Sequence, residues 1–132
     1  MRVLIVEPGK HPIKADIPHT LQSLQQTVGG TIQAIYPWDD PVALVCDDEG
    51  LLKQREFNRY VAPEVVIFGT FFICGLGEED FADLPDDLMD KYAAMFHRPE
   101  VLIATPTGYV VLPAGAADEI QVDSEYSAEQ NF

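Results

Sequence analysis

The sequence predicts a single α+β domain with a mixed, mostly antiparallel sheet and two helices. Short apolar runs rich in β-branched residues alternate with turn residues along most of the chain, as is typical of antiparallel strands. Apolar residues recur at helical spacing in only two segments. With 132 residues, of which 47% are hydrophobic and 23% charged, the chain can bury one core and has a globular composition.

The chain begins with a predicted antiparallel hairpin. Residues 2–8 contain four consecutive apolar side chains, as in an interior strand. Residues 8–12 are expected to form a turn, because Gly9 lies in it between two prolines. Residues 13–17 alternate apolar and polar side chains, which predicts a half-buried second strand.

A short amphipathic helix is expected after the hairpin. Thr20 is the predicted N-cap, and apolar residues recur at Leu21, Leu24 and Val28. Two glycines, residues 29–30, should end the helix, because glycine readily adopts the left-handed C-cap conformation. Together with the strand that follows, these elements have the order ββαβ, which resembles the beginning of a β-grasp fold.

The middle of the chain is predicted to be rich in strands. Residues 31–36 and 42–46 form two of them, whereas residues 51–64 fit either a short returning strand or a loop. Residues 65–74 are the most apolar segment and are expected to form one continuous strand. Within it, Gly69 predicts a β-bulge or a close backbone approach.

The second predicted helix covers residues 83–97. Its core-facing stripe consists of Leu88, Tyr92, Met95 and Phe96. Aspartates fill its expected first turn, where the helix dipole favours negative charge. Residues 101–113 predict two short strands around a turn. We place the domain at residues 1–112 and expect residues 113–132 to form an acidic, flexible tail.

Charge is the strongest compositional feature. Eight basic residues against 22 acidic ones give a net charge of −14. Residues 1–66 contribute −3 (six basic, nine acidic) and residues 67–132 contribute −11 (two basic, 13 acidic). Such a chain repels phosphate backbones and anionic membranes, so direct binding to nucleic acid or to a membrane is not expected. Solubility is the simplest reason for the charge, and imitation of a polyanion is the alternative.

No motif predicts catalysis, a cofactor or a metal ion. Residues 75–77, Gly-Leu-Gly, resemble part of a phosphate-binding loop, but three carboxylates follow directly and would repel a phosphate. The serines and histidines show no nucleophile or zinc-ligand spacing. Cys46 and Cys74 end apolar strands and are expected to be buried, reduced thiols. We therefore expect a non-enzymatic protein without a cofactor.

Three elements are candidate partner-binding sites. The loop of residues 36–40 places aromatic surface beside carboxylates that could hold a cation, although a packing role is favoured for its tryptophan. The basic cluster of residues 53–59 could pair with the acidic helix of its own chain or of a second copy in a homodimer. Four aspartates of residues 80–90 have spacings that place them on one helical face. The candidate residues are Tyr36, Trp38, Asp39, Asp40, Lys53, Arg55, Asn58, Arg59, Glu78, Glu79, Asp80, Asp83, Asp87 and Asp90.

Four ordered blocks of sequence resemble a known family. The blocks are "VLIVEPGK", "LQQTVGGTIQAIYPWDD", "LVCDDEGLL…NR" and "GTFFICGLGEEDF", all within residues 1–100. The family they resemble is numbered 3846 among the domains of unknown function. The resemblance implies a small protein of a phage or another mobile element, often in gut bacteria. It implies no catalytic residue for this chain.

These features predict a cytoplasmic module that binds another protein or itself, as an accessory protein of a phage or mobile element. The alternative is a polyanion mimic whose acidic face and tail inhibit a DNA-binding protein. A small enzyme or metal-dependent hydrolase forms a third class, which no motif supports. The N-terminus lacks the apolar core of a signal peptide, and no apolar run approaches the roughly 20 residues of a membrane helix.

Overall fold

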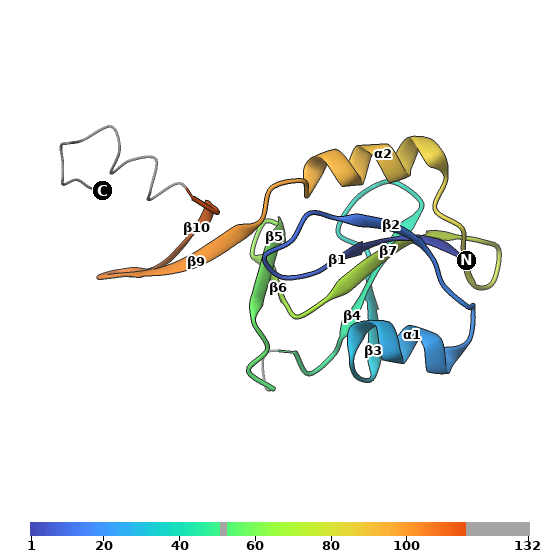
Figure 1. Ribbon diagram of the computed structural model, residues 1–132, viewed down its shortest axis with the longest axis horizontal. Helices are drawn as coiled ribbons and strands as arrows, with labels where there is room; N and C mark the ends of the chain where they lie inside the picture. Colours follow the sequence, from blue (N-terminus) through green and yellow to red (C-terminus); the bar gives the residue numbers. More distant parts are fainter. Residues whose placement is uncertain (51–52, 116–132) are drawn as a thin grey trace.

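An antiparallel sheet forms the centre of the fold. The computed structural model describes residues 1–50 and 53–115 (Figure 1). The sheet contains β1 (Arg2–Val6), β2 (Ile13–Asp16), β3 (Ile32–Ile35), β4 (Val42–Asp47), β7 (Phe71–Leu76) and β8 (Phe81–Ala82). Its strand order is β2-β1-β7-β4-β3, with β8 pairing to β7, and these strands all pair antiparallel. The predicted α+β class and the opening order ββαβ are therefore confirmed.

One helix covers each face of this sheet (Figure 1). α1 (Leu21–Val28) packs through Leu24 against one face. α2 (Asp86–Met95) packs through Met89 and Tyr92 against the opposite face. Because β4 and β7 lie between the two helical layers, both of their faces are buried, and their sequences are continuous apolar runs.

The ends of α1 follow the predicted signals. Oγ1 of Thr20 accepts a hydrogen bond from the Ser23 N–H at 3.1 Å, which caps the first turn. Gly29 adopts a φ of +82° at the C-cap. Leu24 is buried as expected, whereas Leu21 is 61% exposed and adds little to the core.

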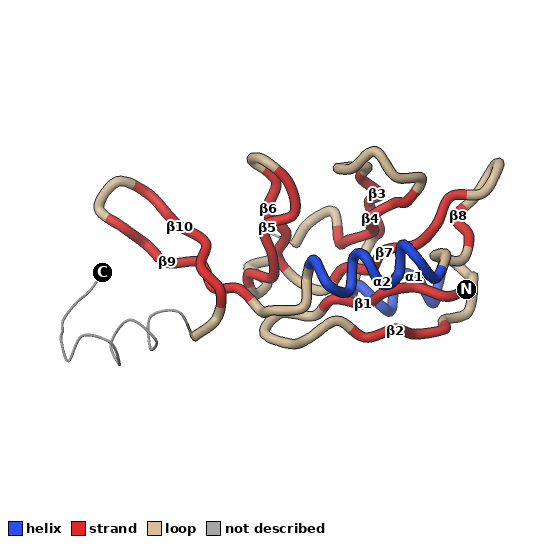
Figure 2. Tube along the Cα trace, turned by 90° about the horizontal axis from the view of Figure 1, so that it is seen from above, coloured by secondary structure: helices blue, strands red, loops and turns tan. Residues whose placement is uncertain are grey.

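Two smaller sheets of two strands each accompany the main one. One pairs β5 (Phe57–Ala62) with β6 (Val65–Phe68), and the other pairs β9 (Glu100–Thr105) with β10 (Gly108–Pro113). Figure 2 shows the β9–β10 hairpin projecting from the rest of the protein. The two strands predicted around the turn at residues 106–108 are confirmed, and the segment left open at residues 51–64 contains a strand.

Residues 65–74 form two strands, so the prediction of one continuous strand was wrong. The chain turns at Gly69, whose φ is +86°, between β6 and β7. β6 pairs with β5, whereas β7 enters the main sheet. The sequence did not reveal the break because both halves are equally apolar and a single glycine separates them. A Cβ at Gly69 would lie 3.0 Å from Cδ of Arg55, so the turn also packs closely.

The segment after β7 folds back before the second helix begins. The Gly77 N–H donates to the Asp80 carbonyl at 2.8 Å, and β8 then pairs with β7. A side chain at Gly75 would overlap the carbonyl oxygen of Asp83, which lies beside it in this pairing. α2 therefore begins at Asp86 rather than at Asp83 as predicted.

The predicted acidic tail falls mostly on residues 116–132, which lie outside the described residues. Pro113 belongs to β10, and the Ala114 N–H donates to the Pro99 carbonyl at 2.7 Å. The first residues assigned to the tail therefore close the base of the hairpin. No helix in the described part of the chain is long and apolar enough to cross a membrane.

Candidate functional site

The loop between β3 and β4 is packed against α2 through its tryptophan. Nε1 of Trp38 donates to the Val61 carbonyl at 3.1 Å. Its ring centroid lies 4.6 Å from that of Tyr92, and the side chain packs against the core. These contacts agree with the packing role favoured for Trp38, whereas Tyr36 in the same loop is exposed.

Asp40 fastens the same loop to α2. Its Oδ2 accepts hydrogen bonds from Nζ of Lys91 at 2.6 Å and from the hydroxyl of Tyr92 at 2.7 Å. These bonds, that from Lys91 first, hold the pKa of the Asp40 carboxyl below its ordinary value. Burial, and then the hydrogen bond with Asp40, raises the pKa of Tyr92, so this hydroxyl remains a neutral donor. The neighbouring Asp39 is exposed.

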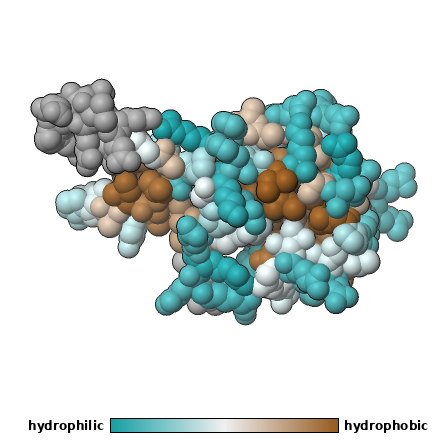
Figure 3. Space-filling view, viewed as in Figure 1, coloured by the Kyte–Doolittle hydropathy of each residue, from teal (hydrophilic) through white to brown (hydrophobic). Residues whose placement is uncertain are grey.

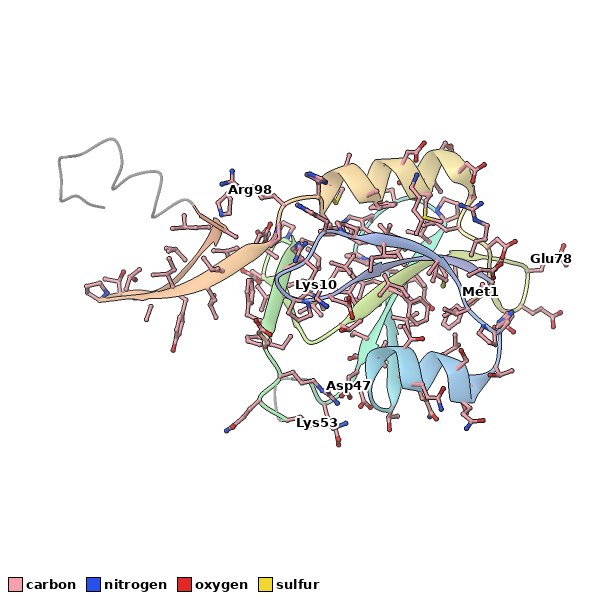
Figure 4. All side chains as sticks on the ribbon, viewed as in Figure 1. Met1, Lys10, Asp47, Lys53, Glu78 and Arg98 are labelled. Atoms are coloured by element: carbon pink, nitrogen blue, oxygen red, sulfur yellow. The ribbon has the colours of Figure 1, made fainter. Side chains whose placement is uncertain are left out.

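The exposed part of the basic cluster pairs with β4, so its predicted pairing with the acidic helix of the same chain was wrong. Figure 4 shows Lys53 beside Asp47, with Nζ 3.0 Å from Oδ2. Nε of Arg55 donates to the same oxygen at 3.2 Å, and its Nη2 donates to the Gly29 carbonyl at 2.5 Å. Burial raises the pKa of the Asp47 carboxyl, but hydrogen bonds from the Glu49 N–H and Lys53 outweigh burial and leave the pKa lowered.

Asn58 and Arg59 lie inside the protein and present no surface to a partner, since both are 0% exposed. Arg59 donates from Nη2 to the carbonyls of Lys10 (2.7 Å) and Phe96 (2.9 Å). Its Nη1 donates to Oδ1 of Asn58 at 2.8 Å. Burial lowers the pKa of the guanidinium, and the charge of Glu100 opposes this effect. Because Phe96 directly follows α2, the cation also lies at the negative end of the helix dipole.

The acidic residues do not form the predicted strip along one helical face. Asp80 and Asp83 precede α2, which begins at Asp86, and only Asp87 and Asp90 lie on the helix. A spacing of three and four residues places side chains on one face only within a helix, so it does not align Asp80 and Asp83 with Asp87 and Asp90. All of these side chains are exposed.

Two of these aspartates contact β1 and β2. Oδ1 of Asp83 accepts a hydrogen bond from the Arg2 N–H at 2.9 Å. Oδ1 of Asp90 lies 2.7 Å from Nζ of Lys14, although this pair is solvent-exposed and adds little stability. Asp83 and Asp90 therefore belong to the fold's own contacts, which makes them poorer candidates for binding a partner.

An acidic hollow lies between the loop that contains Tyr36 and the segment that follows β7, which are distant in the sequence. It has a volume of about 360 Å³ and is lined by Tyr36 and by residues 76–81, which include Glu78, Glu79 and Asp80. An aromatic face beside carboxylates can contact a cationic side chain. Glu78 lies at the end of the protein opposite the β9–β10 hairpin (Figure 4).

The two cysteines lie in the core of the protein. Cys46 and Cys74 are buried free thiols, as predicted. Burial raises the pKa of Cys46 to about 11 and that of Cys74 to about 12, so both are protonated at neutral pH. Within residues 1–50 and 53–115, no three His, Cys, Asp or Glu side chains are grouped to hold a metal ion.

A large apolar groove lies outside the three elements that the sequence singled out. It has a volume of about 940 Å³ and separates the β5–β6 ribbon from the β9–β10 hairpin. Its apolar lining comes from both sheets: Tyr60, Val66, Phe68, Leu102, Tyr109, Val110 and Val111. Figure 3 shows hydrophobic surface gathered over the hairpin. Contiguous exposed apolar surface of this kind marks interaction sites in proteins.

The hairpin is apolar on both faces, yet none of residues 100–113 is buried. Cross-strand pairs share a face of the ribbon. The paired residues Leu102 and Val111 both line the groove, and Val110 lines it as well, whereas its partner Ile103 is not part of the lining. An isolated two-stranded hairpin is at best marginally stable in water, and packing of another surface against its apolar faces would stabilise it.

Contacts at its base hold the hairpin in place. Oε1 of Glu100 accepts a hydrogen bond from the Tyr60 N–H of β5 at 2.9 Å. Arg98, labelled in Figure 4, donates from Nη2 to the Ala114 carbonyl at 2.9 Å. The base of the hairpin is therefore fixed to β5 and to the segment after α2, while its tip extends away from them.

A sequence signal for this surface existed. Residues 101–112 contain no charged side chain, although the chain as a whole has 22 acidic and eight basic residues. Both predicted strands are continuous apolar runs rather than alternating ones, a pattern typical of strands buried on both faces. The pattern was interpreted as two ordinary strands because nothing in the sequence showed that the hairpin would lie outside the core.

Comparison with known proteins assigns the chain to a family. No curated protein and no solved structure matches it. The family model described as "Domain of unknown function (DUF3846)" matches residues 1–97. The match includes the main sheet, both helices and the β5–β6 ribbon, and it ends before the β9–β10 hairpin. The chain therefore belongs to the DUF3846 family, as the four sequence blocks had indicated.

Proposed function

We propose that this protein is a non-enzymatic, protein-binding accessory module that acts in the cytoplasm, and that it binds through the apolar groove and the β9–β10 hairpin. The setting in a phage or mobile element, implied by the family resemblance, is part of this proposal. The observation that carries it is a hairpin that has no charged side chain between residues 101 and 112 and no buried residue on either of its apolar faces.

The character of the groove supports a protein ligand. Its lining mixes aliphatic side chains with the rings of Tyr60 and Tyr109. Tyrosine is enriched in protein–protein interfaces because its ring is apolar while its hydroxyl tolerates water. Tyr109 is 71% exposed, so it is available to a partner without any rearrangement of the fold. The contact surface thus differs from the three elements that the sequence favoured.

Capture of proteins by the immobilised full chain tests this proposal. The bait is exposed to a lysate of the organism that encodes the chain, and bound proteins are identified by mass spectrometry. Tyr109→Glu places a charge in the groove, and Leu21→Glu is the matched control because Leu21 is also exposed (61%) but lies on α1. We expect salt-resistant binding that Tyr109→Glu loses and Leu21→Glu keeps. Equal capture by all three baits would contradict the proposal.

The acidic hollow beside Tyr36 supports a second candidate function, inhibition of a DNA-binding protein by polyanion mimicry. Its carboxylates are exposed, and residues 67–132 have a net charge of −11. The variant to test is Glu78→Lys with Glu79→Lys, because Asp83 and Asp90 have structural contacts. Under this alternative, binding weakens with salt, is lost in the double variant and survives Tyr109→Glu.

A further inference from the structure

We infer that the protein bound by the groove is a second copy of this chain, with the two hairpins exchanged across a two-fold axis. The hairpin of each copy lies in the groove of the other. This inference rests on the proposed function and adds the identity of the partner. The hairpin side of this surface lies beyond the residues matched by the family, whereas Tyr60, Val66 and Phe68 lie within them.

The first support is the apolar lining of the groove, which limits the kind of segment that can bind in it. The groove is walled by uncharged side chains, apart from Glu100 at the base of the hairpin. A partner segment must therefore be apolar and free of charge where it enters. Residues 101–112 of a second copy meet this requirement, because they contain no charged side chain and project far enough from the body to reach another molecule (Figure 2).

The outer edge of β10 provides the second support. Among the described strands, β10 pairs only with β9, so the backbone groups of its other edge have no strand beside them. Such an edge accepts another strand readily. A two-fold axis makes β10 its own antiparallel partner, since the same patch then contributes from both copies.

Charge distribution is the third support, because it decides where two copies can meet. With a net charge of −14 each, two copies repel one another over most of their surfaces. Residues 101–112 carry no charge, and the acidic hollow marked by Glu78 lies at the opposite end of the protein (Figure 4). Association through the hairpins keeps the two acidic hollows far apart. Association through the acidic end would bring like charges together.

Sedimentation of the full chain over a range of concentrations tests the inference. We expect a mass of twice 14.7 kDa at high micromolar concentration, and dissociation on dilution. Tyr109→Glu and Tyr109→Lys should each weaken the dimer by about tenfold or more, about 1.4 kcal/mol or more, because both place a charge in an apolar contact. Leu21→Glu, which adds the same charge on α1, should leave the dissociation constant unchanged. Circular dichroism checks that every variant is folded.

The response to salt separates this dimer from an electrostatic one. Raising the salt concentration from about 0.05 M to about 0.5 M screens the repulsion between copies, so the dimer should tighten several-fold. A dimer held by the basic cluster and the acidic face would weaken instead. Weakening by salt, or a dimer that Tyr109→Glu leaves intact, overturns the inference.

A monomer at all concentrations also overturns the inference, and the capture experiment then decides the proposed function separately. If Tyr109→Glu still loses a captured protein that Leu21→Glu retains, the groove binds a different protein and the proposed function stands. If all baits capture the same proteins, both proposals fail.

Discussion

β4 and the β9–β10 hairpin have similar sequences and opposite surroundings. β4, Val42–Asp47, is buried at every position between the two helical layers. β9, Glu100–Thr105, is just as rich in aliphatic residues, and neither it nor β10 has a buried position. Both sequences have the continuous apolar pattern that is typical of strands buried on two faces. For β4 the fold provides both layers of cover, whereas within the described residues the hairpin faces an open groove against the β5–β6 ribbon.

The comparison shows that an apolar pattern records how much surface a segment must bury, but not what buries it. In β4 the cover is intramolecular, and the strand belongs to the core that holds the fold together. In the hairpin the same composition leaves no residue buried, so under the proposed function we expect it to act in association rather than in folding. Substitutions in the two regions should therefore affect different measurements, and stability should be separable from binding.

The largest expected effect comes from Arg59, the buried arginine of β5. Arg59→Met removes the donors to two buried acceptors, the Phe96 carbonyl and Oδ1 of Asn58, and to the partly buried Lys10 carbonyl. At about 1–3 kcal/mol for each unsatisfied group, we expect a loss of about 3 kcal/mol or more in the free energy of unfolding, measured by urea titration. Arg2→Met, at an exposed site, is the control and should change stability by less than about 0.5 kcal/mol. Equal effects would show that Arg59 does not hold β5 to the core.

A matched pair of valine substitutions compares how much β4 and the hairpin each contribute to the free energy of unfolding. Val45→Ala removes methyl groups from a fully buried site in β4 and should cost about 2 kcal/mol of unfolding free energy, from lost burial plus a cavity. Val110→Ala, at a 42% exposed site in β10, should cost less than about 0.5 kcal/mol. Val110→Ala should instead weaken the dimer in sedimentation. Similar losses of stability at both sites would contradict the distinction between core and hairpin.

Acid should destabilise the protein by protonating the carboxyl of Asp47 at the end of β4. The pKa of this carboxyl is lowered in the folded protein from an ordinary value of 3.8. Its stabilising contribution is therefore present above pH 3.8 and is lost as the pH falls through the lower, folded-state pKa. We expect Asp47→Asn to reduce the loss of unfolding free energy in this acidic range. An unchanged acid profile in the variant would exclude this role.

Thiol reactivity provides the smallest effect and the simplest assay. Cys46 and Cys74 are buried, with pKa values raised to about 11 and 12, and should react with a thiol reagent at pH 8 only as fast as the protein opens. The added thiol of Val110→Cys should react at once in dilute solution. It should react more slowly at high protein concentration, where the dimer covers it. Reaction at the same rate at both concentrations would oppose the dimer.

Local signals were sufficient to predict most of the elements. The N-cap at Thr20 and the glycines after α1 bounded that helix correctly, because capping depends on near neighbours. The turn at Gly69 and the short strand β8 were missed, because each is decided by which distant strand accepts the chain. Tertiary pairing of this kind leaves no local pattern.

Much of the candidate site could not be predicted for a related reason. Arg59 was assigned to a surface cluster because arginine is almost never fully buried unless it is paired. Its partners are carbonyl groups of residues 10 and 96, which are distant in sequence and invisible to a pattern of side chains. The groove likewise arises between the β5–β6 ribbon, which ends at Phe68, and a hairpin that starts only at Glu100. Only the absence of charge from residues 101–112 pointed to it.

Hydrogen exchange of the full chain at two protein concentrations tests the central claim most directly. Backbone amides of β4 and β7 should be protected equally at both concentrations, because the fold itself buries them. Amides of β9 and β10 should exchange rapidly in dilute solution and become protected when the protein is concentrated. Hairpin amides that exchange at the same rate at both concentrations would contradict the claim that a second copy covers this surface.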